Sequence, residues 1–478
     1  MNPTAWLLSA ENRSVSILLV ANSAYAALAL GYSLFQWSYA ARFRREWFAD
    51  KLACGRQARH AAPGPHLPAV DVIVPCFNEK PEVLEACCEA LERQREHYPG
   101  PIHVWLVDDG SAALAELQPV YTRFEGLPGW TVIRHERNRG KRRAQDSAFR
   151  RGKGDYVVTV DSDTTLVPKC VARLVSAMER NPRAGATSGH VTARNAGANR
   201  LTALIDRRYR FLFEQERAAQ SWHRTVTCCS GPVSVYRREV LATLWNSYVD
   251  DLFLGRQRQF GDDLKLSLLV LEQACDSLYW PSARARTIVP ETLRGYARQQ
   301  VRWNKSFYRE LPRADHALRQ HRSSRYLELR RLRYFGRFLA RYLGWSGAHR
   351  YVRFELAARA LVPWLPPVLV AAGAWSALAV PGPVRWLPLL ATVVVMLLHA
   401  LVIGLKSGSF TFPVLYGLIH LTMLTSVRLR ALATLTDSRW GTRGDTGPRG
   451  RRSSSPSARR VRRSPAPPSS PPAERATG

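Results

Sequence analysis

The sequence predicts an α/β domain that is flanked by membrane-spanning helices. From about residue 71 to residue 290, short apolar runs rich in β-branched residues end in polar turns and alternate with stretches of helical character. Four uncharged stretches, at residues 15–37, 361–380, 386–405 and 407–427, approach or exceed the ~20 residues that a helix needs to cross a bilayer. This segregation within 478 residues excludes a simple soluble enzyme, although the mean hydropathy is slightly polar.

The first apolar stretch predicts an uncleaved signal anchor with its N-terminus outside, within a segment 1–41. Arg13 precedes the stretch, and several cations follow it, namely Arg42, Arg44, Arg45 and Lys51. These flanks are the reverse of those of a secretory signal peptide. Cleavage near Ala26 is the alternative interpretation.

The middle of the chain, residues 42–310, predicts a mostly parallel sheet. The expected strands are residues 71–75, 103–107, 131–134 and 156–160, and the expected helices are residues 80–93, 142–150, 169–179 and 263–273. Ligands of such sheets bind at the carboxyl ends of the strands. The polar motifs follow the strands at those ends.

Three of these motifs suit a nucleotide. Asn78 and Glu79 follow the first strand, and a carboxylate of the Asp108-Asp109 turn can accept from a base or a ribose, or simply cap the turn. Lys141 follows a glycine at a helix start, where backbone amides and the helix dipole favour a phosphate. The spacing of a P-loop and that of a dinucleotide-binding loop are absent, which argues against an ATPase or a dinucleotide enzyme.

Two pairs of acids predict the chemistry. Asp161 and Asp163, just past a buried strand, can share Mg²⁺ or Mn²⁺ with a diphosphate, and a metal-free turn is the alternative. Asp262 and Asp263 open a predicted helix, where either acid can cap the helix or act as a general base.

Gln299, Arg302 and Trp303 fall on nearby turns of one predicted helix. An arginine can bind diphosphate oxygens in a fork, and an indole offers a flat face to a sugar ring. A surface helix is the alternative for any one of them.

The C-terminal part predicts contact with a membrane surface. Nine arginines and a single acid, Glu328, alternate with apolar residues between Arg322 and Arg353, which favours amphipathic interface helices at residues 311–353 over a solvated basic face. In the membrane region 354–443 we expect residues 361–380 and 386–405 to span, and residues 407–427 to be re-entrant or interfacial. The Arg/Ser/Pro-rich tail, residues 444–478, is expected to be disordered and cytoplasmic.

The formal net charge of +31 raises nucleic acid as a partner. However, the basic clusters flank membrane segments and no recognised nucleic-acid module is present. Anionic lipid is therefore the expected partner and nucleic acid is not.

Taken in order, these motifs resemble the processive β-glycosyltransferases of family 2, which have a GT-A catalytic domain. Asn138-Arg-Gly-Lys-Arg, the run from Cys229 to Glu239, the run from Arg302 to Glu310 and Trp440-Gly-Thr-Arg443 most closely resemble class I hyaluronan synthases. Chitooligosaccharide and chitin synthases are the near neighbours. Leu264 replaces the usual arginine of the hyaluronan synthases, and one N-terminal span stands where several of them have two.

The resemblance implies roles for the site residues. Asp109 contacts the nucleotide, Lys141 lies with the diphosphate, and Asp161 and Asp163 serve the ribose and the metal. Asp263 acts as the base, Arg302 and Trp303 hold the diphosphate and the acceptor, and Trp440 closes over the donor.

We therefore expect a multi-pass plasma-membrane enzyme with a cytoplasmic catalytic domain. It would use UDP-GlcNAc and UDP-GlcA to make and export hyaluronan by inversion, and its partners would be UDP-sugars, the growing polysaccharide and lipid. The alternative is a chitin or chitooligosaccharide synthase that uses UDP-GlcNAc alone. A transferase that glycosylates a lipid without processivity is a third possibility, against which the Gln299-Arg302-Trp303 motif argues.

Overall fold

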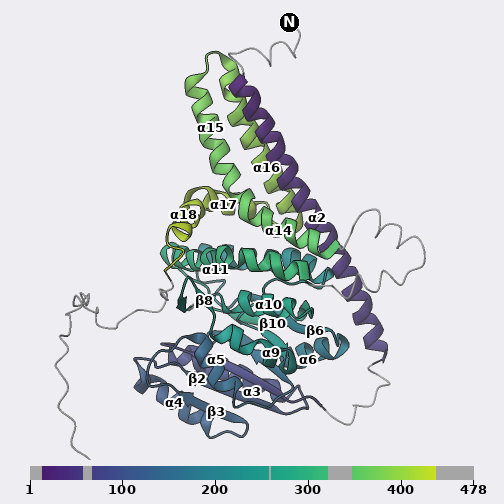
Figure 1. Ribbon diagram of the computed structural model, residues 1–478, viewed down its shortest axis with the longest axis vertical. Coiled ribbons are helices and arrows are strands. Elements are labelled where there is room, and N and C mark those ends of the chain that lie inside the picture. Colours follow the sequence, from purple (N-terminus) through teal and green to yellow (C-terminus); the bar gives the residue numbers. More distant parts are fainter. Residues whose placement is uncertain (1–12, 58–66, 258–259, 321–346, 438–478) are drawn as a thin grey trace, which may run out of the picture. The chain divides into compact units, whose positions relative to one another are not determined.

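The computed structural model describes residues 13–57, 67–257, 260–320 and 347–437. Its centre is an eight-stranded sheet with the strand order β3-β2-β1-β4-β7-β6-β10-β5 (Figure 1). The strands are β1 (Val70–Cys76), β2 (Ile102–Asp108), β3 (Trp130–Arg134), β4 (Tyr156–Thr159), β5 (Thr164–Leu166), β6 (Ala184–Ala193), β7 (Ser234–Arg237) and β10 (Asp276–Thr287). A separate hairpin consists of β8 (Leu252–Phe253) and β9 (Arg256–Gln257).

The four strands expected from sequence are confirmed, but the sheet is mixed. β1 pairs in parallel with β2 and β4, and β2 with β3, whereas β7 runs antiparallel to both β4 and β6. Because β7 is reversed, its amino end, Ser234, lies beside the carboxyl end of β4, Thr159. The loop that precedes β7 therefore reaches the same edge of the sheet as the turns that follow β1, β2 and β4.

Helices cover both faces of the sheet. They are α3 (Pro81–Arg95), α4 (Leu114–Glu125), α5 (Lys141–Phe149), α6 (Cys170–Arg180), α7 (Arg200–Phe211), the π-helix η2 (Leu212–Arg217), α8 (Ala218–Trp222), α9 (Arg238–Val249), α10 (Asp262–Glu272) and α11 (Leu293–Gln320). α3, α4 and α6 pack together on one face, and α5, α9 and α10 on the other. The helices expected at residues 80–93, 142–150, 169–179 and 263–273 are confirmed as α3, α5, α6 and α10.

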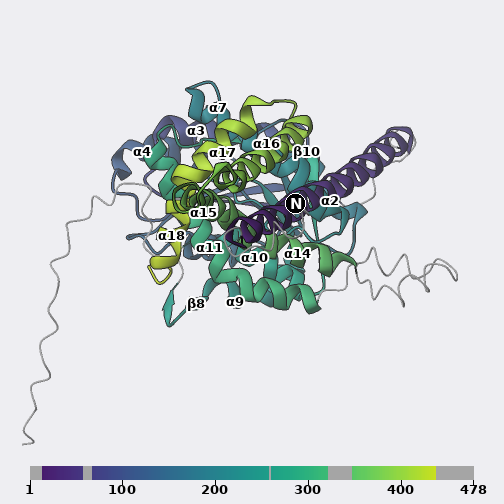
Figure 2. The same ribbon diagram turned by 90° about the horizontal axis from the view of Figure 1, so that it is seen from above.

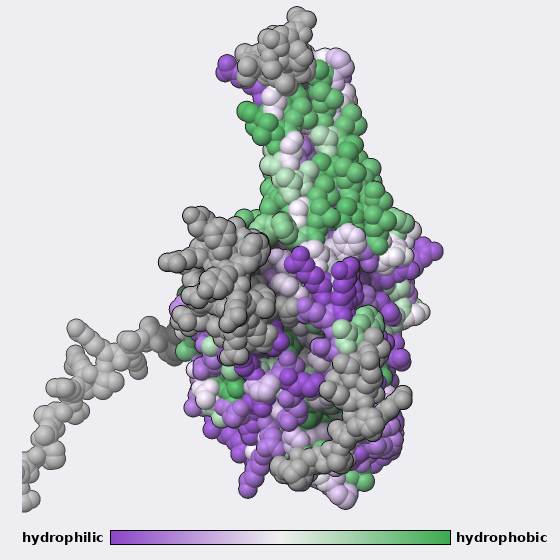
Figure 3. Space-filling model, turned by 90° about the vertical axis from the view of Figure 1, so that its right-hand side faces the viewer, coloured by the Kyte–Doolittle hydropathy of each residue, from purple (hydrophilic) through white to green (hydrophobic). Residues whose placement is uncertain are grey.

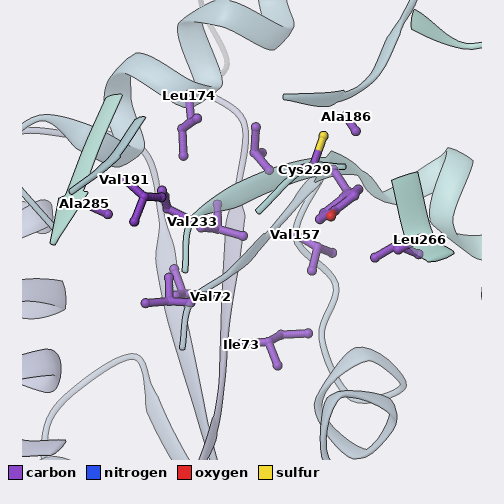
Figure 4. Close-up of a cluster of buried hydrophobic side chains, with 14 of the residues drawn as sticks. Val72, Ile73, Val157, Leu174, Ala186, Val191, Cys229, Val233, Leu266 and Ala285 are labelled. Carbon is purple, nitrogen blue, oxygen red and sulfur yellow. The ribbon is translucent and has the colours of Figure 1, made fainter. Parts of the chain in front are cut away.

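The core lies between these layers. Figure 4 shows Val72 and Ile73 of β1, Val157 of β4, Leu174 of α6 and Leu266 of α10 among its buried side chains. Strands buried on both faces explain the continuous apolar runs in the sequence. The rigid sheet fixes the backbone from which the polar turns project.

The remaining helices include long apolar stretches. They are α2 (Arg13–Gln57), α14 (Gly347–Leu361), η3 (Val362–Trp364), α15 (Leu365–Ala379), η4 (Pro383–Trp386), α16 (Leu387–Ser407), α17 (Thr411–Ile419), η5 (His420–Leu424) and α18 (Thr425–Ala433). α2 packs along α15 and α16 (Figures 1 and 2), and hydrophobic side chains cover the outer surface of this bundle (Figure 3). Among the described residues, four helical stretches are long and apolar enough to cross a membrane: Arg13–Asp50, Tyr351–Ala379, Pro383–Ser407 and Thr411–Ala433.

The last of these stretches overlaps the segment, residues 407–427, that the sequence predicts to be re-entrant or interfacial. Its length and composition are adequate for a span, and it also packs on the catalytic domain, through α17 against α7 and through α18 against α11. Its relation to the bilayer stays a prediction. Two further helices cross expected boundaries, since α2 continues past residue 41 and α11 past residue 310. Most of the basic segment and the whole tail lie outside the described residues.

Candidate active site

The turns at the carboxyl edge of the sheet are fixed by hydrogen bonds between loops. The amide of Asn78, which has a φ of 48°, donates to Ser111 Oγ at 2.8 Å, and its side-chain Oδ1 accepts from the amide of Ala112 at 2.8 Å. Glu79 accepts from the hydroxyl of Ser162 at 2.8 Å. Asn78 and Glu79 thus join the turns after β1, β2 and β4, and their expected contact with a ligand stays a prediction.

Asp109 is buried and holds the loop that leads into α5. Its carboxylate accepts from the amides of Arg139, at 3.0 Å, and Gly140, at 2.7 Å, and Nδ1 of His135 lies 2.8 Å from its Oδ1. These contacts place Lys141, the first residue of α5. In the structure Asp109 accepts hydrogen bonds from this loop. Nothing in the sequence alone indicates His135 as its partner.

Lys141 brings two distant motifs together. Its ammonium lies 2.7 Å from Asp161 Oδ1 and 2.7 Å from Asp262 Oδ2. Burial by itself lowers the pKa of Lys141, but these two carboxylates outweigh burial and raise its pKa well above the ordinary value. Lys141 is therefore a fixed positive charge at the centre of the site.

Asp262 and Asp263 are adjacent in sequence, but their pKa values are shifted in opposite directions. Burial alone raises the pKa of Asp262, yet the ammonium of Lys141 outweighs it and holds the pKa below its ordinary value. Burial raises the pKa of Asp263, and the negative charge of Asp262 raises it further. One carboxyl is thus a permanent anion, and its neighbour is a stronger base than an ordinary aspartate.

Asp263 also has a partner that sequence reasoning missed. The thiol of Cys228 donates to Asp263 Oδ2 across 3.5 Å, and the amide of Leu264 donates to Oδ1 at 2.8 Å. Cys228 belongs to the loop ahead of β7, which reaches this edge because β7 is reversed. The Cys229-Ser-Gly-Pro run beside it was the available signal, although it indicated no role for the thiol.

The residues present fit a divalent cation. Asp163 Oδ1 accepts from Thr287 at 3.0 Å, and a Cβ at Gly231 would lie 3.2 Å from Oδ2 of Asp161, so the absence of a side chain there leaves this oxygen accessible. Hard oxygen donors suit Mg²⁺ or Mn²⁺. Across the described ranges, no group of three or more His, Cys, Asp or Glu side chains could hold a metal ion. The described residues therefore contribute two carboxylates at most to such a site.

α11 carries the aromatic side of the site. Trp303 is 45% exposed, and its ring centroid lies 6.2 Å from that of Tyr209 on α7. Tyr209 is also hydrogen-bonded to Gln299. Burial raises the pKa of the Tyr209 hydroxyl, and the negative charge of Asp163 raises it further. Arg302 also lies on α11.

Lys265, the residue after Leu264, is buried and pairs with Asp251 at 2.7 Å, so it supports the fold. Trp440 lies outside the described residues.

The fold is that of the GT-A glycosyltransferases. The model of the Glycosyl transferase family 2 matches residues 71–245. An N-acetylglucosaminyltransferase of Sinorhizobium fredii (strain NBRC 101917 / NGR234) is 34% identical over 427 residues, 89% of this chain and 94% of its own length. One of Rhizobium meliloti (strain 1021) is 36% identical, with 78% and 81% of the two chains covered.

The chain therefore belongs to glycosyltransferase family 2 and is a glycosyltransferase. Among solved structures, the mannosyltransferase PcManGT from Pyrobaculum calidifontis in complex with GDP-Man and Mn²⁺ superposes with a TM-score of 0.53. It is 20% identical, and the match covers 85% of this chain and 99% of that one. This likeness confirms the expected GT-A fold. The family implies a nucleotide-sugar donor.

Proposed function

We propose that the protein is a membrane-bound, inverting N-acetylglucosaminyltransferase that extends a β-linked N-acetylglucosamine chain from UDP-GlcNAc. The chemistry rests on one observation, the adjacent acids Asp262 and Asp263 whose pKa values are displaced in opposite directions beside Lys141. The sugar rests on the relatives named N-acetylglucosaminyltransferase. They favour the chitooligosaccharide alternative over the hyaluronan interpretation.

In the proposed reaction Asp263 takes the proton from the acceptor hydroxyl. Its raised pKa suits this role, since a base is most effective when its pKa lies near the working pH. The acceptor oxygen then attacks the anomeric carbon from the side opposite to the diphosphate, which departs as UDP. Trp303 offers the acceptor sugar a stacking surface from α11.

Three cationic contributions would stabilise the departing diphosphate. Lys141 lies at the centre of the acids, and Arg302 presents a guanidinium from α11. Asp161 and Asp163 would hold Mg²⁺ or Mn²⁺, which supplies positive charge to the leaving group when it is bound. Because the described residues provide at most two carboxylates there, we expect the diphosphate and water to complete its coordination.

The membrane helices suit the export of a polar polymer, which cannot cross hydrocarbon without a path lined by protein. We propose that residues 42–310 form the cytoplasmic catalytic unit and residues 311–353 lie on anionic lipid. We further propose that residues 354–443, including Trp440, form the C-terminal membrane region of a plasma-membrane enzyme.

A two-donor assay tests the sugar. The purified protein in detergent is given UDP-GlcNAc, UDP-GlcA or both, with Mg²⁺ or with Mn²⁺, and UDP release and polymer are measured. Polymer from UDP-GlcNAc alone is expected. Polymer only when both donors are present would refute the proposal in favour of hyaluronan.

Substitution tests the base. Asp263→Asn should reduce transfer by about 10²–10⁴-fold, as the loss of a general base does, while UDP binding stays near normal. The matched control is Asp250→Asn, because Asp250 is an exposed carboxylate whose ion pair within the described residues is with Arg143 rather than with a site residue. An active Asp263→Asn enzyme would exclude the role of Asp263.

A further inference from the structure

One face of α11 carries two buried cations that the proposed chemistry does not use. Lys305 is 6% and Arg309 5% exposed, and the four-residue spacing stacks them on adjacent turns. Ser306 lies beside them on the same helix and is also buried. A buried cation is costly unless hydrogen bonds compensate it, so the contacts of this face indicate what it does.

The first set of contacts holds the chain that follows α18. Nε of Arg309 donates to the carbonyl of Leu435 at 2.8 Å, and one terminal nitrogen donates to that of Asp437 at 3.0 Å. Lys305 Nζ donates to the same Asp437 carbonyl at 3.2 Å. α11 therefore binds the backbone of residues 435–437, which follow α18, through side-chain hydrogen bonds.

The second set holds the loop of the proposed base. The Arg309 guanidinium lies 4.7 Å from the ring centroid of Phe260 and 5.1 Å from that of Phe253 in β8. Gly261 has a φ of 78°, and a Cβ there would lie 2.6 Å from Ser306 Oγ, so the loop rests directly on α11. Phe260 and Gly261 immediately precede Asp262 and Asp263.

We propose that Arg309 is a positioning residue for Asp263 and that it makes the placement of Asp263 depend on residues 435–437. The hydrogen bonds to two carbonyls fix the plane of the guanidinium, because such bonds are directional. The fixed guanidinium in turn holds the ring of Phe260 through a cation–π contact. This inference rests on the proposed function only in that Asp263 is taken as the base.

The test uses the full chain in lipid nanodiscs and the substitution Arg309→Gln. Arg313→Gln is the matched control, because Arg313 lies one turn further along α11, is 38% exposed, and pairs with Glu272 at the opposite end of α10 from Asp262 and Asp263. Initial rates of UDP release give kcat and the KM of the donor. Hydrogen exchange followed by mass spectrometry reports on residues 260–264 and 434–437.

Arg309→Gln should lower kcat by about 10- to 100-fold, the size expected when a reacting group is displaced by ~1 Å. The KM of the donor should change less than about threefold, since loss of base geometry affects the chemical step more than donor binding. Exchange should become faster in both segments together, and the control should alter none of these quantities. In Arg309→Lys, kcat and the exchange rates should lie between those of wild type and Arg309→Gln. The lysine ammonium keeps a positive charge near the rings but cannot donate to two carbonyls from one planar group.

Three results would overturn the inference: an unchanged kcat in Arg309→Gln, faster exchange in only one of the two segments, or a rise in KM with kcat preserved. If Arg309→Gln does not fold, Arg309→Lys decides, and wild-type rates and exchange in that variant would refute the role. If wild-type protein does not use UDP-GlcNAc, the proposed function fails, but the paired exchange measurement still tests whether Arg309 couples the two segments.

Discussion

Replacing Lys141 with methionine should destabilise the catalytic domain measurably. The side chains of Lys141, Asp161 and Asp262 are 17%, 29% and 13% exposed, and both N–O distances are 2.7 Å. Removing one partner of a buried ion pair costs about 3–5 kcal/mol, and this partial exposure places the expected cost near the lower end, about 3 kcal/mol. For a domain of this size that corresponds to roughly 6–12 °C in apparent Tm.

The destabilisation should depend on charge and not on lost volume. Without Lys141 the pKa of Asp262 is expected to rise, because the ammonium that holds it down is gone. The double variant Lys141→Met/Asp262→Asn removes the uncompensated anion and should regain about half of the lost Tm. A lower pH should also reduce the difference between Lys141→Met and wild type, since Asp262 then becomes protonated.

The assay is thermal unfolding of the detergent-purified protein, with Lys153→Met as the control at an exposed lysine. An apparent Tm of Lys141→Met within about 2 °C of wild type would refute the electrostatic role of Lys141, given the shift of ~2–4 °C per kcal/mol. A double variant no more stable than Lys141→Met would refute the explanation by uncompensated charge.

Three further predictions concern turnover. The acid limb of the pH profile of kcat should lie above the ordinary pKa range of an aspartate, because the pKa of Asp263 is raised. Asp262→Asn should move this limb to lower pH, because it removes the negative charge that raises the pKa of Asp263. A limb at the same pH in that variant would exclude the electrostatic effect of Asp262 on Asp263. Trp303→Leu should weaken acceptor binding about 5- to 150-fold, which corresponds to a loss of roughly 1–3 kcal/mol. The Tm should not change because the indole is 45% exposed, and saturation of the rate with an oligosaccharide acceptor measures the binding. Gly231→Ala should raise the metal concentration needed for half-maximal rate, because the new Cβ would lie 3.2 Å from Asp161 Oδ2, and an unaltered metal titration would contradict this.

Much of the fold could be predicted from the sequence. β1, β2, β3 and β4, together with α3, α5, α6 and α10, lie within about two residues of their expected positions. Local periodicity sufficed here because each element buries a regular pattern of apolar side chains. The reversed strand β7 was not predicted, since strand direction depends on pairing with distant residues.

The candidate site was predicted as separate motifs and not as contacts. The sequence singled out Lys141, Asp161 and Asp262, but nothing in it indicates that one ammonium joins both acids. His135 and Cys228 were missed as partners of Asp109 and Asp263, because neither residue lies in a recognisable pattern.

The sequence by itself determined the kind of protein. Strand-and-helix periodicity and four apolar stretches indicate an α/β domain attached to a membrane, because these properties reside in local order and residue type. The order of the polar motifs adds the resemblance to the glycosyltransferases of family 2. Only the tertiary structure shows that the pKa of Asp262 is lowered and that of Asp263 is raised. The pKa of each carboxyl depends on burial and on charges brought close by folding: Lys141 lies beside Asp262, and Asp262 in turn beside Asp263.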